Sequence, residues 1–375
     1  MDKRNCQWRS APGWLMVLAL LIGGVLCPGP AKAVDSDYFL DFSRVAVLPV
    51  GVVELTALHL RMDDHIDLFD VREREISAQT AKTFSGLGDL KGARLLANWG
   101  VFAATQLHGE YRWRNLDNGL LKMDIDSYEL SVRQLVRSAS AGRSAWAVDF
   151  GTRINRSGDQ NIRSIAEIDL FVKRINRNYS ISQSPSHLII SNGPGTGFFP
   201  RANTPQLQVS VQDLFDISPF VRVSSGWSLG SWEPALFLEL GRSWVDSSID
   251  SNLNAIVGTT FASVAADFPL KLDREENYAK AGFNLYGPGP LGTLGNLRYE
   301  YVRLDRPSSL DAVNYNHILK ADLVLPVTPV WALNLGATYY CRQLNGVIPF
   351  LYNRYTQSSY DHDYGTVHLG LVASF

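Results

Sequence analysis

The feature that most constrains this chain is a period of two in its apolar residues, which recurs in segments of roughly ten residues. In QLHGEYRWR (106–114), Leu107, Tyr111 and Trp113 alternate with polar and charged side chains. AWAVDFGTR (145–153) and ALFLELGRSW (235–244) alternate in the same way. Because successive side chains of a β-strand point to opposite faces, these segments are predicted to be strands with one apolar and one polar face.

Turn-forming residues separate these segments, and nothing between them has the length of a membrane helix. Beyond the N-terminal region, no run approaches the 18 or so apolar residues that a transmembrane helix needs. In the segment 120–138 the apolar positions change face between Ile125 and Tyr128, which predicts a β-bulge. The chain is therefore predicted to be all-β. Clusters of Gly, Pro, Asn and Asp mark the predicted turns, at 115–119, 156–160, 287–292 and 326–329.

The N-terminal region resembles a secretory signal peptide. A basic start precedes an apolar run at 14–27, and the stretch that follows ends in AKA (31–33), which has the small-x-small form of a cleavage site. We therefore expect residues 1–33 to be removed and residues 34–375 to form one domain. Cleavage leaves Cys341 as the remaining cysteine, so no disulfide bond is expected within the mature chain.

Two all-β architectures fit such strands, a soluble sandwich and a transmembrane barrel. A sandwich buries its apolar faces between two sheets, whereas a membrane barrel turns them towards lipid and keeps its polar faces in the lumen. Long strands, dense charge of both signs on the polar faces and the lack of an internal repeat favour the barrel. The candidate lumen-lining residues are His108, Glu110, Arg112, Arg114, Asp149, Arg153, Glu167, Asp169, Lys173 and Glu239.

The last eight residues carry the most specific motif of the chain, HLGLVASF (368–375). The motif begins with polar His368, has Gly370 in third place and ends on the aromatic Phe375. It resembles the C-terminal assembly signal of Gram-negative outer-membrane β-barrel proteins, a porin-like superfamily. The resemblance implies export through the inner membrane to the bacterial outer membrane. It also implies outer-membrane lipid, the barrel assembly machinery and periplasmic chaperones as partners.

Together these features predict an antiparallel, up-and-down transmembrane β-barrel of about 14 strands, within a range of about 12 to 16, because bacterial barrels have even strand numbers. Short periplasmic turns and longer outer loops are typical of such barrels. The predicted strands include 161–175, 205–212, 219–228 and 254–267. The alternation of strand directions places the connections 176–204 and 343–362 outside the cell and the turns at 287–295 and 326–329 in the periplasm.

Two local motifs have a ligand-binding interpretation that their residues do not support. GPGPLG (287–292) matches a nucleotide-binding pattern, but Pro288 and Pro290 lack the backbone N–H groups that a phosphate needs, so a turn is predicted. YDHDYG (360–365) carries two Asp residues but not the number of ligands of a closed metal site. No cofactor and no metal are therefore expected.

An enzymatic alternative rests on the stretch SHLIISNG (186–193). Its Ser-Asn-Gly triplet is similar to that of outer-membrane phospholipase A, which gives Ser191 and His187 as an alternative catalytic pair. In that family the His and Ser lie two residues apart, whereas here they are four apart. A serine needs a positioned base for activation, so the segment is interpreted first as part of a loop that enters the barrel mouth or packs on its rim.

The charge of the chain limits its function. A net charge of −2 provides no basic excess for nucleic acid. Mixed charges in the lumen indicate either a weakly selective aqueous pore or a lumen filled by ion pairs. The leading expectation is a porin-like channel for passive passage of small polar solutes. The alternatives are the lipid hydrolase and a structural barrel that serves an export or electron-transfer assembly.

Overall fold

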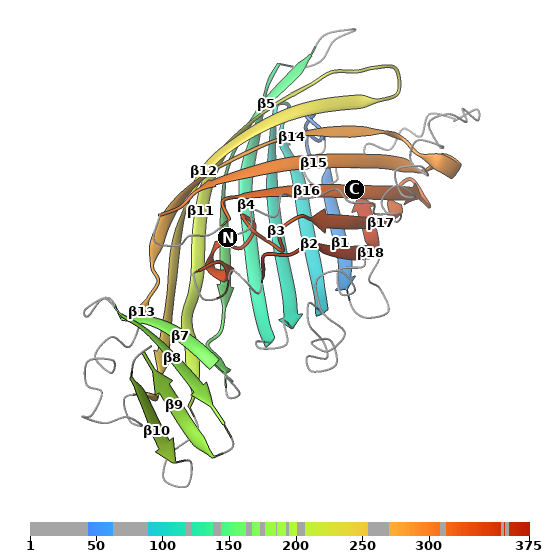
Figure 1. Ribbon diagram of the computed structural model, residues 1–375. Helices are drawn as coiled ribbons and strands as arrows, with labels where there is room; N and C mark the ends of the chain where they lie inside the picture. The colour runs from blue at the N-terminus through green and yellow to red at the C-terminus, as the bar shows by residue number, and fades with distance from the viewer. Residues whose placement is uncertain are drawn as a thin grey trace.

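Twelve antiparallel strands pair in a closed ring in the computed structural model (Figure 1). The ring closes between β18 and β1, where Val53 and Phe375 exchange two backbone hydrogen bonds of 3.0 and 2.9 Å. In ring order the strands are β1 (Val53–Met62), β2 (Asp89–Phe102), β3 (Thr105–Asp117), β4 (Lys122–Arg137), β5 (Ala145–Ser157), β11 (Val209–Gly226), β12 (Glu233–Ser251), β14 (Arg274–Pro288), β15 (Leu294–Asp305), β16 (Tyr315–Pro326), β17 (Trp331–Tyr340) and β18 (Tyr364–Ser374). The structure describes residues 44–62, 89–117, 122–137, 144–162, 167–172, 177–184, 186–192, 195–200, 207–253, 270–307, 313–353, 356 and 360–375.

The two ends of the barrel differ in their connections. At the end where β1 begins and β18 finishes, here called the terminal end, neighbouring strands are joined by short connections. One of them contains the 3-10 helix η4 (Pro290–Gly292), so the GPGPLG motif is a turn as predicted. At the other end, the loop end, lie the long connections, which include 158–208 and 341–363. No helix within the described ranges is long and apolar enough to cross a membrane.

The outer face of the barrel carries an apolar belt. Along β12, Leu236, Leu238 and Leu240 are 53%, 50% and 56% exposed, whereas Phe237 and Glu239 between them are buried. Soluble proteins rarely expose a continuous apolar surface of this kind, and membrane barrels present such a belt to lipid. Other exposed apolar side chains of the ring strands are Leu55, Leu95, Trp99, Leu130, Trp146, Phe150, Val221, Trp244, Phe283, Trp331, Leu333, Leu335, Leu369 and Leu371.

The predicted strand count of about 14 is not confirmed, because two predicted strands are one. The segments 205–212 and 219–228 belong to the single strand β11 and its approach. A bulge joins its two halves: the register with β12 shifts between Gln212 and Phe215, and Asp213 has a left-handed φ of 56°. The local irregularity looks like a strand boundary in the sequence, although pairing continues on both sides of it.

β4 is regular where the sequence predicted a bulge, so that prediction was wrong. Its pairing with β3 and β5 runs without a register shift from Ile125 to Leu135. Met123 and Ile125 are buried on the inner face, whereas Tyr128 and Leu130 are exposed on the outer face. The apolar positions change face because the inner face itself is apolar near the loop end.

Between β5 and β11 the chain forms a second, four-stranded sheet outside the ring (Figure 1). The predicted barrel strand 161–175 is therefore not part of the wall, and 254–267 lies outside the described residues. The second sheet packs on the ends of β11 and β12 through one apolar cluster, formed by Tyr179, Ile181, Leu188, Ile190, Leu207, Val209, Ile249 and Leu253. Its strands are β7 (Glu167–Val172), β8 (Arg177–Gln183), β9 (His187–Ser191) and β10 (Thr196–Pro200), while β6 (Gln160–Ile162) and β13 (Leu270–Lys271) extend the edges of β11 and β12.

Cys341 follows β17 and is buried. It is disulfide-bonded in this full-length chain. The prediction of no disulfide bond concerns the chain after removal of residues 1–33, and it stays a prediction. The other cysteines, Cys6 and Cys27, lie outside the described residues.

Candidate functional site

The polarity of the side chains on the inner face changes along the barrel axis. Near the terminal end it is polar, with Glu54, Asn98 and Gln106 buried. The middle layer is charged, and the layer next to the loop end is apolar. This apolar layer, together with the loop that covers it, forms the main hydrophobic cluster of the protein. Its members on the ring strands include Leu58, Leu60, Met62, Leu90, Leu116, Met123, Ile125, Val302, Leu304, Ile318 and Tyr340.

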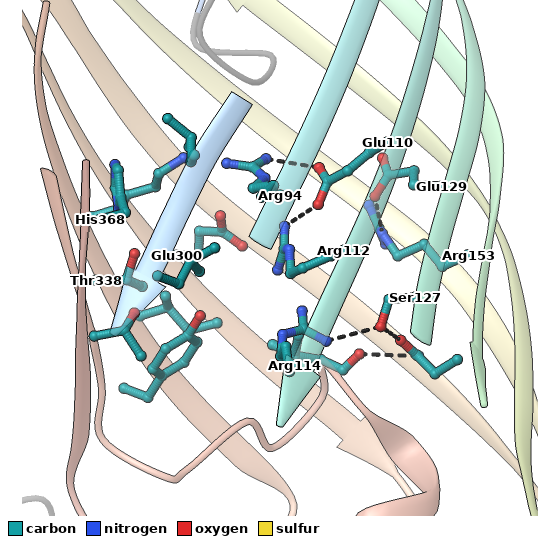
Figure 2. Close-up of a pocket in the computed structure, with 18 of the residues that line it drawn as sticks. Arg94, Glu110, Arg112, Arg114, Ser127, Glu129, Arg153, Glu300, Thr338 and His368 are labelled. Atoms are coloured by element: carbon teal, nitrogen blue, oxygen red, sulfur yellow. Dashed lines mark hydrogen bonds and ion pairs between the residues drawn. The ribbon is translucent and has the colours of Figure 1, made fainter. Parts of the chain in front are cut away.

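A cavity of about 140 Å³ lies in the charged middle layer (Figure 2). Because its residues come from strands around the whole ring, the cavity lies inside the lumen rather than on the outer wall. Its charged lining residues are Arg94, Glu110, Arg112, Arg114, Glu129, Arg153, Arg222, Lys280, Arg298, Glu300 and Lys320. Ser127, Asn155, Thr338, Tyr340, Thr366 and His368 contribute polar groups.

On one side of the cavity, Glu239 is the centre of an ion-pair network. Its carboxylate is fully buried and accepts hydrogen bonds from Arg153 at 2.5 and 3.0 Å and from Arg222 at 2.5 and 2.9 Å. The Lys280 Nζ lies 3.5 Å from the Glu239 Oε1. Arg153 also donates to Glu129 at 2.7 Å. This network links β4, β5, β11, β12 and β14 across the middle of the barrel.

On β2 and β3, one carboxylate pairs with two arginines. Arg94 and Arg112 are cross-strand partners. Both bind Glu110, Arg94 through its Nη2 at 2.7 Å and Arg112 through a second ion pair. Arg114 is only 3% exposed and donates to the Ser127 Oγ at 2.8 Å (Figure 2). Among the residues that the structure describes, Arg114 makes no ion pair.

The lumen is closed at the terminal end by residues 44–49, here called the terminal closure. Arg44 donates to the Glu233 carboxylate at 2.7 and 2.6 Å. The backbone N–H of Leu48 donates to the Gln106 side chain at 2.9 Å, and Leu48 is 1% exposed. The closure therefore rests on charge-assisted and neutral hydrogen bonds and on two buried apolar side chains, Val45 and Leu48.

Residues 341–353, here called the loop closure, cover the apolar layer at the loop end. The Arg274 guanidinium donates to the Pro349 carbonyl oxygen at 2.6 Å, and the Phe350 N–H donates to the Asp216 carboxylate at 3.3 Å. The segment contains the 3-10 helix η6 (Pro349–Leu351). Its buried apolar side chains, each at most 2% exposed, are Leu344, Ile348, Phe350, Leu351 and Tyr352.

His362 follows the loop closure in the connection to β18. Burial lowers the pKa of His362 to about 4. Its imidazole ring contacts the Tyr364 ring edge-on at a centroid distance of 6.3 Å, and its carbonyl oxygen accepts the Gln343 N–H. The neutral imidazole is therefore the form that fits the closed loop.

Most of the predicted lumen residues lie on the inner face of the ring. Glu110, Arg112, Arg114 and Arg153 line the cavity, and Glu239 bonds to its lining cations. His108 and Asp149 lie nearer the terminal end and are 1% and 0% exposed. The His108 Nδ1 is 2.8 Å from the Asn98 Oδ1, and Asp149 accepts hydrogen bonds of 2.6 and 3.2 Å from Arg133.

Two further predicted sites fall outside the ring. Glu167 and Asp169 are on β7, in the second sheet, so they are not lumen residues. Lys173 lies outside the described residues. Glu167 and Asp169 were predicted to line the lumen because the strands of the second sheet alternate as barrel strands do, although they pair with one another.

The alternative catalytic pair is not assembled. His187 and Ser191 occupy the two ends of β9. Four residues along a strand correspond to about 13 Å, which is too far for a hydrogen bond. The His187 Nδ1 instead lies 3.0 Å from the Ser186 Oγ.

The residues of the C-terminal motif make packing and hydrogen-bond contacts within the ring. His368 is buried, and its Nε2 lies 2.8 Å from the Asp322 Oδ1. A Cβ added to Gly370 would lie 1.9 Å from the backbone oxygen of Ala57, so β1 and β18 approach too closely there for a side chain. Phe375 is 61% exposed and contacts the Trp331 ring edge-on.

Several residues of the cavity were missed in the sequence. The charged ones are Arg94, Glu129, Arg222, Lys280, Arg298, Glu300 and Lys320. The signal was the same period of two: in RYEYVRL (298–304), Arg298 and Glu300 alternate with outward tyrosines. Within the described residues no three His, Cys, Asp or Glu side chains gather as a metal site.

Comparisons with known proteins give distant structural similarities. No protein-family model matches the sequence, and no curated protein matches it. The translocator domain of the autotransporter NalP from Neisseria meningitidis superposes with a TM-score of 0.45 at 7% identity, covering 88% of this chain and 90% of that chain. The NanC porin gives 0.40 at 9% identity, covering 86% and 98%, and LpxR from Salmonella typhimurium gives 0.39 at 9%, covering 86% and 99%.

Proposed function

We propose that this protein is a porin-like channel of the bacterial outer membrane, through which small polar solutes pass passively when its two closures move. The observation that carries the proposal is the cavity of about 140 Å³ lined by charged side chains in the middle of a closed barrel. Charged rings at a constriction set the selectivity of pores. The apolar belt, the predicted signal peptide and the C-terminal motif support the outer-membrane location.

The proposed channel is closed at rest. The terminal closure and the loop closure each cross the lumen, and the charged cavity lies between them. Passage therefore requires both segments to leave their places. The terminal end is expected to face the periplasm, since short turns are typical of that side. Assembly by the barrel assembly machinery and periplasmic chaperones stays a prediction from the C-terminal motif.

Conductance in planar lipid bilayers tests the proposal. The chain from Val34 onwards is compared with a variant that also lacks residues 34–49, and so lacks the terminal closure. We expect brief openings of the first and more frequent openings of the second. A matched control that exchanges Leu229 for Ala, an exposed residue of a terminal-end turn, should behave like the unaltered chain. Silence of both chains, and of a variant with a weakened loop closure, across a voltage series would exclude the channel.

One observation favours a second candidate, a structural barrel that serves a partner assembly. Chain segments contact the inside of the ring near both ends of the lumen, as expected of a barrel that does not conduct. This candidate predicts silent bilayers together with a stoichiometric partner that co-purifies with the barrel. The separation of Ser191 from His187 gives the lipid hydrolase no comparable support. If Ser191 were nevertheless catalytic, the Ser191→Ala variant would lose any lipid hydrolysis that the purified protein shows.

A further inference from the structure

The charges that line the cavity are unequal in number. Eight lining side chains are Arg or Lys, and three are Glu. Two further carboxylates outside the lining, Glu239 and Asp322, form ion pairs with lining cations. Even with these included, cations exceed anions. On β2 and β3, Arg94 and Arg112 both pair with Glu110, and Arg114 makes no ion pair within the described residues.

Arg114 is the most unusual cation of this group. Its guanidinium is 3% exposed, and its hydrogen-bond partner is the neutral Ser127 hydroxyl. Ser127 in turn donates to the Asn155 side-chain oxygen at 2.6 Å. A buried charge without a counter-ion is costly, and the described part of the chain supplies no carboxylate within ion-pair distance of Arg114.

Beside Arg114, the Arg112 guanidinium has an N–H group that makes no hydrogen bond. The Arg112 Nε is buried and has no hydrogen-bond partner. Arg112 and Arg114 are two residues apart on β3, so both side chains extend from the same strand face into the cavity (Figure 2). A guanidinium binds carboxylates and phosphates through paired N–H donors. The two guanidinium groups therefore line the same space, and the positive charge of Arg114 has no counter-ion among the described residues.

We propose that the Arg112–Arg114 pair is a binding site for a small oxyanion, a carboxylate or phosphate group, inside the lumen. The proposal rests on the proposed function, in which solutes reach the lumen when a closure moves. The cavity has space for several water molecules, since one water needs on the order of 10–15 Å³ of such volume. It therefore accommodates an anionic group of a few atoms rather than a large ligand. The bound oxyanion would supply the counter-charge that the protein does not.

A purely structural role for Arg114 makes a different prediction. If Arg114 only connects β3 to β4 through Ser127, its replacement lowers stability and leaves anion affinity unchanged. If it binds an oxyanion, Arg114→Gln loses affinity, and Arg114→Lys, which keeps the charge but not the planar guanidinium, retains part of it. Arg156 of β5 is the matched control, since it is 59% exposed and lies on the outer face beside Asp126.

The experiment measures binding of succinate and, separately, inorganic phosphate to the detergent-solubilised chain from Val34 by calorimetry. Both ligands are tested against the chain that lacks residues 34–49. We expect saturable binding, weakened about tenfold or more in Arg114→Gln, as for loss of one charge-assisted pair, and unchanged in Arg156→Gln. Preference for one ligand identifies the source of the oxyanion. Folding of each variant is verified by its heat-modifiable mobility in gels.

Reversal potentials across a KCl gradient separate this inference from the proposed function. A conducting chain that prefers chloride, with a preference that Arg114→Gln reduces, supports both. Saturable binding without conductance supports the anion site and removes the channel. Conductance without saturable binding, or equal binding by unaltered chain and Arg114→Gln, overturns the anion site and leaves the channel standing. If Arg114→Gln does not fold, Arg112→Gln is measured in its place, and unchanged affinity again overturns the proposal.

Discussion

Phe350 is the residue whose truncation should loosen the loop closure most directly. Its side chain is 1% exposed and packs in the main hydrophobic cluster, beside Ile348 and Tyr352 of the same segment. Truncating a buried Phe to Ala costs about 3–5 kcal/mol. The Phe350 N–H still reaches Asp216 in Phe350→Ala, so the change acts through packing. At about 1.4 kcal/mol per factor of ten, the equilibrium between closed and open loop should shift by roughly two to three and a half orders of magnitude.

Two measurements report the shift independently. Limited proteolysis with trypsin should cut Phe350→Ala after Arg342, a site within the loop closure, much faster than the unaltered chain. Single-channel recordings should show a higher open probability, provided that the chain conducts. Phe198→Ala is the matched control, because Phe198 lies on β10 and is 63% exposed. Equal proteolysis of Phe350→Ala and Phe198→Ala in folded barrels would refute the argument that packing of Phe350 holds the loop in place.

Three further predictions concern charge, pH and the seam of the ring. Glu239→Gln leaves the buried Arg222 and Lys280 and the partly buried Arg153 around a neutral amide, and the free energy of unfolding should fall by about 3–5 kcal/mol, as for a broken buried ion pair. An unchanged urea midpoint would contradict the network. Burial lowers the pKa of His362 to about 4. The stability that the neutral imidazole gives the closed loop is therefore fully present above the unfolded pKa of about 6.5 and is lost as the pH falls towards 4. Proteolysis of the loop should rise over that pH window in the unaltered chain and not in His362→Gln. Gly370→Ala should reduce refolding in detergent, where no assembly machinery is present, because its Cβ would meet the Ala57 backbone, whereas Gly109→Ala, which has nothing within 4 Å, should refold normally; equal refolding would show that Gly370 matters for recognition and not for packing.

The wall of the barrel was predictable because its rule is local. In β3 and β5 each side chain points to the inner or the outer face according to position alone, so alternation placed Glu110, Arg112, Arg114 and Arg153 on the inner face without any knowledge of their partners. Alternation alone does not distinguish a ring strand from a strand of the second sheet. Pairing partners decide that difference, and β7 alternates as a ring strand does.

The closures were not predictable from alternation, yet the strands that they cover carried a signal. Along β1 the inner positions change from Glu54 and Thr56 to Leu58, Leu60 and Met62. Apolar side chains on the inner face of an aqueous pore would stay in contact with water. Each of them would then lack the stabilisation of about 25 cal/mol per Å² that burial of apolar area provides. Apolar residues at lumen positions near one end therefore indicate that a segment of the chain, or of a partner, covers them.

The two closures should consequently differ in the ease with which they open. Removing the loop closure exposes the apolar layer together with five buried apolar side chains of the closure itself. Removing the terminal closure breaks the hydrogen bonds of Arg44 to Glu233 and of Leu48 to Gln106, whose groups water then satisfies. A net hydrogen bond contributes about 0.5–1.5 kcal/mol, or about 1.5–3 kcal/mol where a group is charged. The terminal closure buries two apolar side chains, Val45 and Leu48, whereas the loop closure buries five. We therefore expect the terminal closure to open first, so that the arginine-lined cavity meets solvent from the terminal end before the loop closure moves.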